Sequence, residues 1–152
     1  MYERILVPLD GSKTGEAAIP NVEDLAARMA PATKIEIVLL QVVSTLTYNV
    51  LTESGTAQIP YSDKEMQQIK QKAGEYLDTV AGNMRAKGLN ARTMVTAGHA
   101  AEEIVKVAHE IKANIIAMST HGLSGIKRWA LGSIADKVLH ISDIPVLIIR
   151  AK

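Results

Sequence analysis

The loop most suited to chemistry in this sequence is rich in glycine and hydroxyl groups. It reads STHGLSG over residues 119–125; Lys127 and Arg128 follow, and a helix start is expected at Gly132-Ser133. Glycines let the backbone approach a ligand closely, and the free N–H groups and dipole of a helix start favour negative charge. Glycines, hydroxyl groups, two cations and a helix start together are suited to binding an anion. Taken singly, each glycine is more often a turn residue, Ser133 could be only an N-cap, and the two cations could belong to a solvated face.

Asp10 is the second candidate, because it follows the apolar run 5–9 and precedes Gly11 and Ser12. A carboxylate at the end of a strand can accept a hydrogen bond from a ligand in a crevice. An Asx turn with Gly11 and Ser12 explains the same residues equally well.

Common catalytic motifs are missing. The sequence has no GxxxxGK[ST] phosphate loop, no GxGxxG after its first strand and no HExxH zinc helix. The stretch HGLSG at 121–125 is one residue short of the GxSxG nucleophile elbow. The sequence therefore indicates a binding crevice more clearly than a catalytic site.

The composition is that of one globular domain over residues 1–152, with 47% hydrophobic and 22% charged residues. A net charge of +1 gives no strong general field for nucleic acid or an anionic membrane. The absence of cysteine excludes disulfides, thiolate metal sites and cysteine nucleophiles. No apolar run approaches the ~20 residues of a membrane span, and we see no signal peptide in the opening MYERILVPLD. We expect a cytoplasmic protein that binds neither nucleic acid nor membrane.

Short apolar runs alternate with segments of helical spacing. The predicted strands are Ile5–Leu9, Ile35–Val43, Ala91–Val95, Ile115–Met118 and Pro145–Ile149. Helical faces are predicted at Val22/Leu25/Ala26/Met29, Ile69/Ala73/Tyr76/Val80/Met84, Ile104/Val105/Ala108/Ile111 and Ile134/Val138/Ile141. Pro20 must lie near the start of the first helix, and Gly88 ends the second.

This alternation predicts an α/β fold, a doubly wound five-stranded parallel sheet with helices on both faces. The favoured strand order is 3-2-1-4-5, which makes strands one and four neighbours and brings the loops after them into one crevice. Residues 44–62 fit no element. We expect a lid, a binding loop or disorder there, and the apolar side chains favour partial docking on the domain.

Several segments of the sequence resemble the universal stress protein family. The opening YERILVPLDGS at 2–12 is similar to that family's first strand and loop, and Gly98 followed by Glu102, Glu103, Ile104 and Ala108 is similar to its third helix. Gly122, nine further residues, and Gly132-Ser133 resemble the ATP-binding branch. Ser119 replaces the first glycine of that pattern, which costs little if its backbone stays in an ordinary region. Its hydroxyl could also donate to ribose or phosphate.

The resemblance implies roles for a set of residues in binding ATP, or alternatively AMP or ADP. Pro8, Leu9 and Asp10 would line the adenine and ribose end, Val42 would offer backbone groups to adenine, and Met118 would pack on the sugar. The phosphates would lie against Ser119, His121, Gly122, Leu123, Ser124 and Gly125, with Gly132, Ser133, Ile134 and Ala135 capping them. Mg²⁺ would be held mainly through the phosphates. The resemblance also implies a homodimer through Val146–Ile149, and an apolar edge strand needs such a partner.

Three functions follow from these observations. The leading one is an ATP-binding stress-response protein, a dimeric nucleotide-dependent switch acting on an unknown downstream protein. A slow ATP hydrolase is the second, with His121 as the group suited to proton transfer, although no dedicated general base for water is evident. The third is a partner-binding dimer without nucleotide, which the substitution at Ser119 favours.

Overall fold

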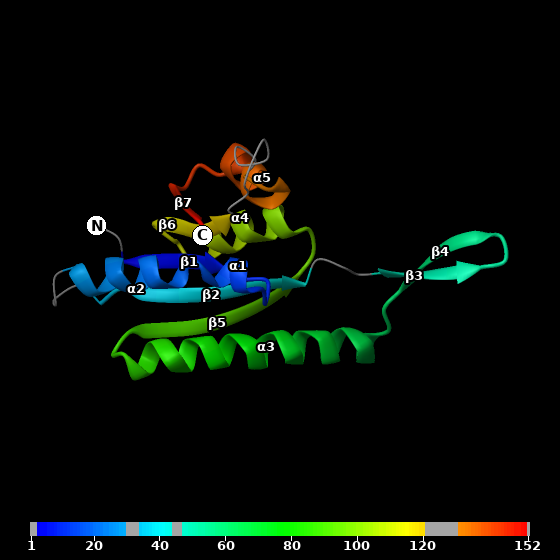
Figure 1. Cartoon of the computed structure of the whole chain (residues 1–152), viewed down its shortest axis with the longest axis horizontal. Helices are drawn as coiled ribbons and strands as arrows, with labels where there is room; N and C mark the ends of the chain where they lie inside the picture. Colours follow the sequence, from blue (N-terminus) through cyan, green and yellow to red (C-terminus); the bar gives the residue numbers. More distant parts are fainter. Residues whose placement is uncertain (1–2, 30–33, 44–46, 121–130, 152) are drawn as a thin grey trace.

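The computed structural model describes residues 3–29, 34–43, 47–120 and 131–151. Figure 1 shows a layered domain from which one hairpin projects. The elements in chain order are β1 (Arg4–Pro8), α1 (Lys13–Glu16), α2 (Ile19–Arg28), β2 (Glu36–Val43), β3 (Thr47–Thr52), β4 (Gly55–Pro60), α3 (Asp63–Ala86), β5 (Asn90–Ala97), α4 (Ala100–Glu110), β6 (Ile115–Thr120), α5 (Ser133–Ile141) and β7 (Val146–Arg150).

Five strands form one parallel sheet in the order β5-β2-β1-β6-β7. Numbered along the chain, this is the order 3-2-1-4-5, so the predicted fold class and strand order are confirmed. β1 and β6 are neighbours, with Ile5 opposite Ile115, and the strand order reverses between them. The carboxyl ends of these two strands therefore meet at the switch point of the sheet, where ligands of such folds bind.

Both faces of the sheet are covered, which explains why its strands are continuously apolar. Along β1, Ile5 and Val7 belong to the core beneath α2 and α3, whereas Leu6 belongs to the core beneath α4 and α5. All three side chains are fully buried. Strands buried on both faces are expected to show no alternation of polar residues.

The expectation for residues 44–62 was wrong in the part that is described. Thr47–Thr52 and Gly55–Pro60 pair as an antiparallel hairpin, closed by a two-residue turn at Glu53-Ser54. Figure 1 shows this ribbon extending away from the sheet and helices, so it does not dock on the domain as expected. Local pairing satisfies the backbone groups that face between the two strands without help from a core.

Helices α2, α3, α4 and α5 lie where the spacing predicts, except that two residues of the predicted α5 face are exposed, and α1 was not predicted. Pro20 is the second residue of α2, where its missing N–H costs nothing, and Gly88 follows α3 with φ +83°. Ile134 and Ile141 are exceptions to the predicted α5 face, because 45% and 44% of their surfaces are exposed. In the described ranges, no helix has both the length and the apolar character that a membrane span requires.

A charge network joins the strands at the amino end of the sheet. The Glu36 carboxylate accepts hydrogen bonds from Arg4 Nε and, at 2.7 Å, from Arg92 Nε. Burial opposes ionisation of this carboxyl, but the hydrogen bonds and positive charges of the two guanidinium groups outweigh burial and lower the pKa of Glu36. The network thus ties β1, β2 and β5 together.

Replacement of Glu36 should change how stability depends on pH. Because the folded pKa of Glu36 lies below its usual value of 4.5, the stability it contributes is present above that value and is lost as pH falls below it. We expect Glu36→Gln to be less stable than the native chain near neutral pH, with the difference narrowing as acid is added. Urea unfolding at a series of pH values tests this, with the exposed Glu53→Gln as the control. A pH-independent difference would contradict it.

Candidate functional site

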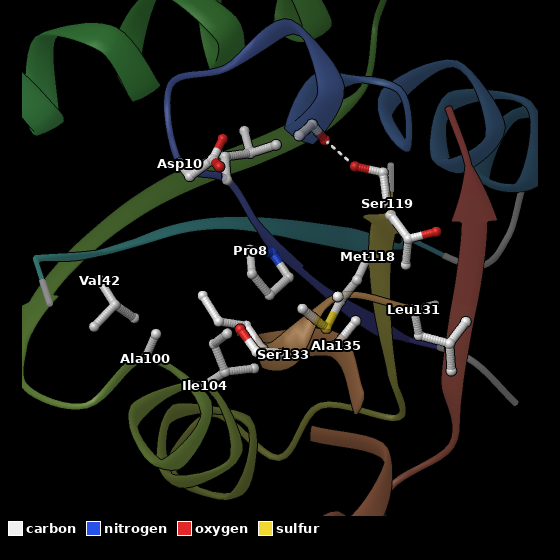
Figure 2. A pocket seen from close by; sticks show the side chains of 15 residues that line it. Pro8, Asp10, Val42, Ala100, Ile104, Met118, Ser119, Leu131, Ser133 and Ala135 are labelled. Atoms are coloured by element: carbon white, nitrogen blue, oxygen red, sulfur yellow. Dashed lines mark hydrogen bonds between the residues drawn. The ribbon is translucent and has the colours of Figure 1, made fainter. Parts of the chain in front are cut away.

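A cavity of about 330 Å³ lies at the carboxyl ends of β1 and β6, where the switch point places it. Figure 2 shows Met118 and Ser119 from β6, Ile104 from α4 and Ala135 from α5 around it. The volume is near the lower end for small-molecule sites, and the surfaces are mainly apolar with a few polar groups, as such sites usually are. The lining is Pro8, Leu9, Asp10, Gly15, Val42, Ala100, Ile104, Met118, Ser119, Thr120, Leu131, Gly132, Ser133, Ile134 and Ala135.

The structure gathers at this one cavity every described residue of the site predicted from the sequence. These are Pro8, Leu9, Asp10, Val42, Met118, Ser119, Gly132, Ser133, Ile134 and Ala135. The remaining predicted residues, His121, Gly122, Leu123, Ser124 and Gly125, lie outside the described residues, as do Lys127 and Arg128.

Sequence reasoning missed Gly15, Ala100, Thr120 and Leu131 as lining residues, and it assigned Ile104 only to a helix face. Ala100 and Ile104 are one turn apart on α4, and this face continues the predicted apolar face of that helix toward the crevice. A search for small or apolar residues in the first turn of α4 would have found both.

The Asp10 side chain forms an Asx turn, which is one of the two roles that the sequence offered for it. Its Oδ1 accepts hydrogen bonds from Ser12 N at 2.9 Å and Ser12 Oγ at 2.5 Å. Ser12 Oγ in turn accepts from Gly15 N at 3.0 Å and so caps α1. A Cβ on Gly15 would lie only 2.6 Å from Asp10 Oδ1, so any other residue here would force the Asp10 carboxylate to shift. The described residues donate no hydrogen bond to Asp10 Oδ2, and that atom remains an acceptor for a ligand at the rim.

Ser119 connects the end of β6 to α1. Its hydroxyl lies 2.5 Å from the Thr14 carbonyl oxygen and 2.9 Å from that of Gly15, and it donates to these acceptors; Figure 2 marks a hydrogen bond of Ser119 by a dashed line. Lys112 is the one described non-glycine residue with positive φ, so Ser119 has an ordinary backbone conformation and the substitution of glycine is unstrained. The hydroxyl binds the protein itself, whereas the sequence had suggested ribose or phosphate.

α1 is also held from its other side. Tyr76 of α3 donates its phenolic proton to Glu16 Oε1 at 3.0 Å. Burial first, and then the hydrogen bond and charge of Glu16, raise the pKa of the Tyr76 phenol, so the proton stays in place at physiological pH. This one-turn helix, a wall of the cavity, is thus fixed between the sheet and α3.

The start of α5 supplies the polar end of the cavity. Gly132 occupies the N-cap position with φ +83°, and α5 has no side-chain cap. Ser133, Ile134 and Ala135, the first residues of the helix, line the cavity. Backbone N–H groups at the start of a helix are unpaired within it and attract anions.

Asp10 is the one ionisable side chain in the described lining of the cavity. Among the described ranges, no three His, Cys, Asp or Glu side chains come together in a way that could hold a metal ion.

Comparison with known proteins identifies relatives along the whole chain. A family model described as the universal stress protein family matches residues 1–150. Universal stress protein YxiE of Bacillus subtilis is 29% identical over 152 residues, which cover 99% of this chain and 100% of that protein. Universal stress protein MJ0577 of Methanocaldococcus jannaschii is 28% identical over 163 residues, covering 100% and 97%.

Solved structures share the same fold. The structure of MJ0577 matches with a TM-score of 0.68 at 26% identity, covering 100% of this chain and 98% of that one. A universal stress protein solved in complex with cAMP has a TM-score of 0.61 at 21% identity and covers 99% of this chain and 98% of its own. One from Archaeoglobus fulgidus, in complex with dAMP, has a TM-score of 0.64 at 16% identity and covers 97% of each chain.

Removal of the Ser119 hydroxyl should loosen α1. In Ser119→Ala the Thr14 and Gly15 carbonyls lose the hydroxyl that links them to β6, and a lost hydrogen bond of this kind costs about 0.5–1.5 kcal/mol of unfolding free energy. Hydrogen exchange should speed up at α1 more than at α4. Ser54→Ala, in the exposed hairpin turn, is the matched control and should change neither quantity. Unchanged exchange at α1 would contradict the role of Ser119.

Proposed function

The chain belongs to the universal stress protein family, and we propose that its cavity binds an adenine nucleotide, ATP foremost and ADP or AMP as alternatives. The bound nucleotide would switch the protein between states that a downstream partner distinguishes. The observation that carries this proposal is the pairing, in one cavity, of an apolar end with an uncapped helix start.

The two ends of the cavity suit the two ends of a nucleotide. Val42 and Ile104 offer an apolar slot for a planar base, and Asp10 at the rim can accept from ribose or base through Oδ2. The N–H groups at the start of α5 suit phosphate oxygens. Mg²⁺ would then be bound through the phosphates, since such ions usually keep few protein ligands when phosphates are present.

Two family members support the choice of an adenine ring. Both were solved with an adenine nucleotide, cAMP in one and dAMP in the other. The unstrained backbone of Ser119 supports it too, because the serine leaves the cavity wall intact in place of the family's glycine. With Asp10 as the one ionisable group in the described lining, we propose that the nucleotide is held as a signal and not turned over.

Binding is tested by titrating ATP into the purified protein in a calorimeter. We expect a dissociation constant below the millimolar range, and an excess of about 100 times that constant should stabilise the fold by about 2.7 kcal/mol. Gly15→Ala should weaken binding about tenfold or more, because its Cβ would displace the Asp10 carboxylate. Gly74→Ala is the matched control, since a Cβ there meets open space on α3. No binding at millimolar ATP would refute the proposal, and the partner-binding alternative would then take its place.

We further propose that β7 forms a homodimer with its copy. β7 is the last strand of the sheet, and within the described residues it pairs with β6 alone. The neighbouring α5 also carries exposed aliphatic side chains, Ile134, Leu139 and Ile141. A bare apolar edge next to exposed aliphatic side chains is the type of surface that a second subunit covers.

The hydrogen-bond pattern identifies a residue that tests this edge. Ala151 N donates to Thr120 O, and Pro145 O accepts from Ile116 N, so the odd-numbered residues of β7 face β6 and the N–H of Ile148 faces outward. Ile148→Pro removes that outward donor and should convert a dimer to a monomer by light scattering. Val95→Pro on β5 is the control, because Gly98 N donates to Val43 O and so the N–H of Val95 faces the opposite free edge. A dimer in both variants, with native circular dichroism, would contradict the β7 interface.

A further inference from the structure

The β3–β4 ribbon (Thr47–Pro60) is a second edge with no role in the nucleotide site. Its two strands pair in register from Thr47–Pro60 to Thr52–Gly55, and Figure 1 shows it projecting well beyond the helices. Leu51 is 88% exposed and Ile59 is 38% exposed. An isolated two-stranded ribbon is marginally stable in water, so a contact that covers these side chains would stabilise it.

The ribbon carries almost no charge. Between residues 47 and 60 the sequence TYNVLTESGTAQIP contains one charged side chain, Glu53, and it lies in the turn rather than in a strand. A ribbon without cations is unsuited to nucleic acid or an anionic membrane, which basic residues recognise. The uncharged side chains of the ribbon are better suited to a contact with another uncharged strand edge.

The two edges of the ribbon differ in their ability to accept a new strand. β4 begins with a glycine, Gly55 at φ +130°, and ends with Pro60, which has no N–H to donate. β3 reads TYNVLT, with β-branched and aromatic residues and neither glycine nor proline. It also lacks the lysine, proline or bulge with which natural edge strands discourage pairing. The free edge of β3 is therefore the competent one.

We propose that β3 pairs antiparallel with β3 of a second copy of this chain, forming a four-stranded sheet in the order β4-β3-β3-β4. Identical strands related by a two-fold axis form a self-complementary contact, and the absence of strand charges removes the repulsion that like charges cause in such a pair. Six-residue strands span about 20 Å, which is small for an interface. The contact is thus weak alone and concentration-dependent, and it joins the proposed β7 dimers into larger assemblies.

The lack of native cysteine makes a direct test possible. An axis perpendicular to the sheet keeps each β3 residue on the same face as its copy, so one β3 position lies directly opposite itself, within disulfide reach. Positions on the two β4 strands are separated by three strand spacings, about 14 Å, and are out of reach. We choose Asn49 and Val50 on β3 and their cross-strand neighbours Gln58 and Ala57 on β4.

Each of the four residues is replaced singly by cysteine, and the proteins are oxidised in a glutathione buffer. We expect rapid disulfide dimers from Asn49→Cys or Val50→Cys and at least tenfold slower formation from Gln58→Cys and Ala57→Cys. Equal rates at all four positions would indicate random collision and overturn the proposal. Faster reaction on β4 would also overturn it, because that result assigns the contact to the other edge.

A second experiment measures association without cross-linking. With Ile148→Pro in every protein to remove the β7 contact, sedimentation is followed from about 10 µM to 1 mM. We expect a rise from one chain to two, abolished by Asn49→Lys, which brings two added charges together across the axis. Gln58→Lys, directly opposite on β4, is the matched control and should retain the rise. A single-chain mass at every concentration, or a rise that survives Asn49→Lys, would refute β3 pairing, whatever nucleotide binding and the β7 test show.

Discussion

The adjacency of β1 and β6 is the constraint on which the remaining architecture depends. Because these strands are parallel and lie at the centre of the sheet, the connections that leave their carboxyl ends must diverge to opposite faces. That divergence opens the cavity, brings Asp10 and Ser119 to its rim, and leaves α5 starting beside it. The hydrogen bonds from Ser119 to α1 then hold the two diverging connections at a fixed distance, so the cavity wall is defined without a ligand.

The sheet could be predicted from the sequence because its signal is repeated at every strand. Runs such as 5–9 and 115–118 are apolar on consecutive residues, and only burial on both faces explains that pattern. Once the strands alternate with helical segments, the parallel order and the crevice follow from topology alone. The proximity of the two loops of the candidate site could therefore be predicted without any knowledge of side-chain contacts.

Features that depend on one contact or one turn could not be found this way. α1 has four residues, too few to show a helical period, so Gly15 was missed together with the acceptors of Ser119. The bond from Ser119 to Thr14 joins residues that are 105 positions apart, and no local pattern encodes it. The ribbon at 47–60 escaped because Glu53-Ser54-Gly55 is a weaker turn signal than Asn-Gly or Asp-Gly, although the paired runs on either side have strand composition.

The outer edges of β5, β7 and β3 differ in how well side chains protect them from pairing with another chain. On β5 the Arg85 guanidinium donates to the outward carbonyl of Ala91, so the amino end of that edge is protected by one of the protein's own side chains. β7 has apolar residues up to Arg150, and β3 has no charge at all. Unprotected edges favour pairing with another strand, so this contrast supports the two pairings proposed above. We expect the β7 contact to be the stronger of the two, because β7 is supported by a packed sheet and α5, whereas β3 is supported by one strand.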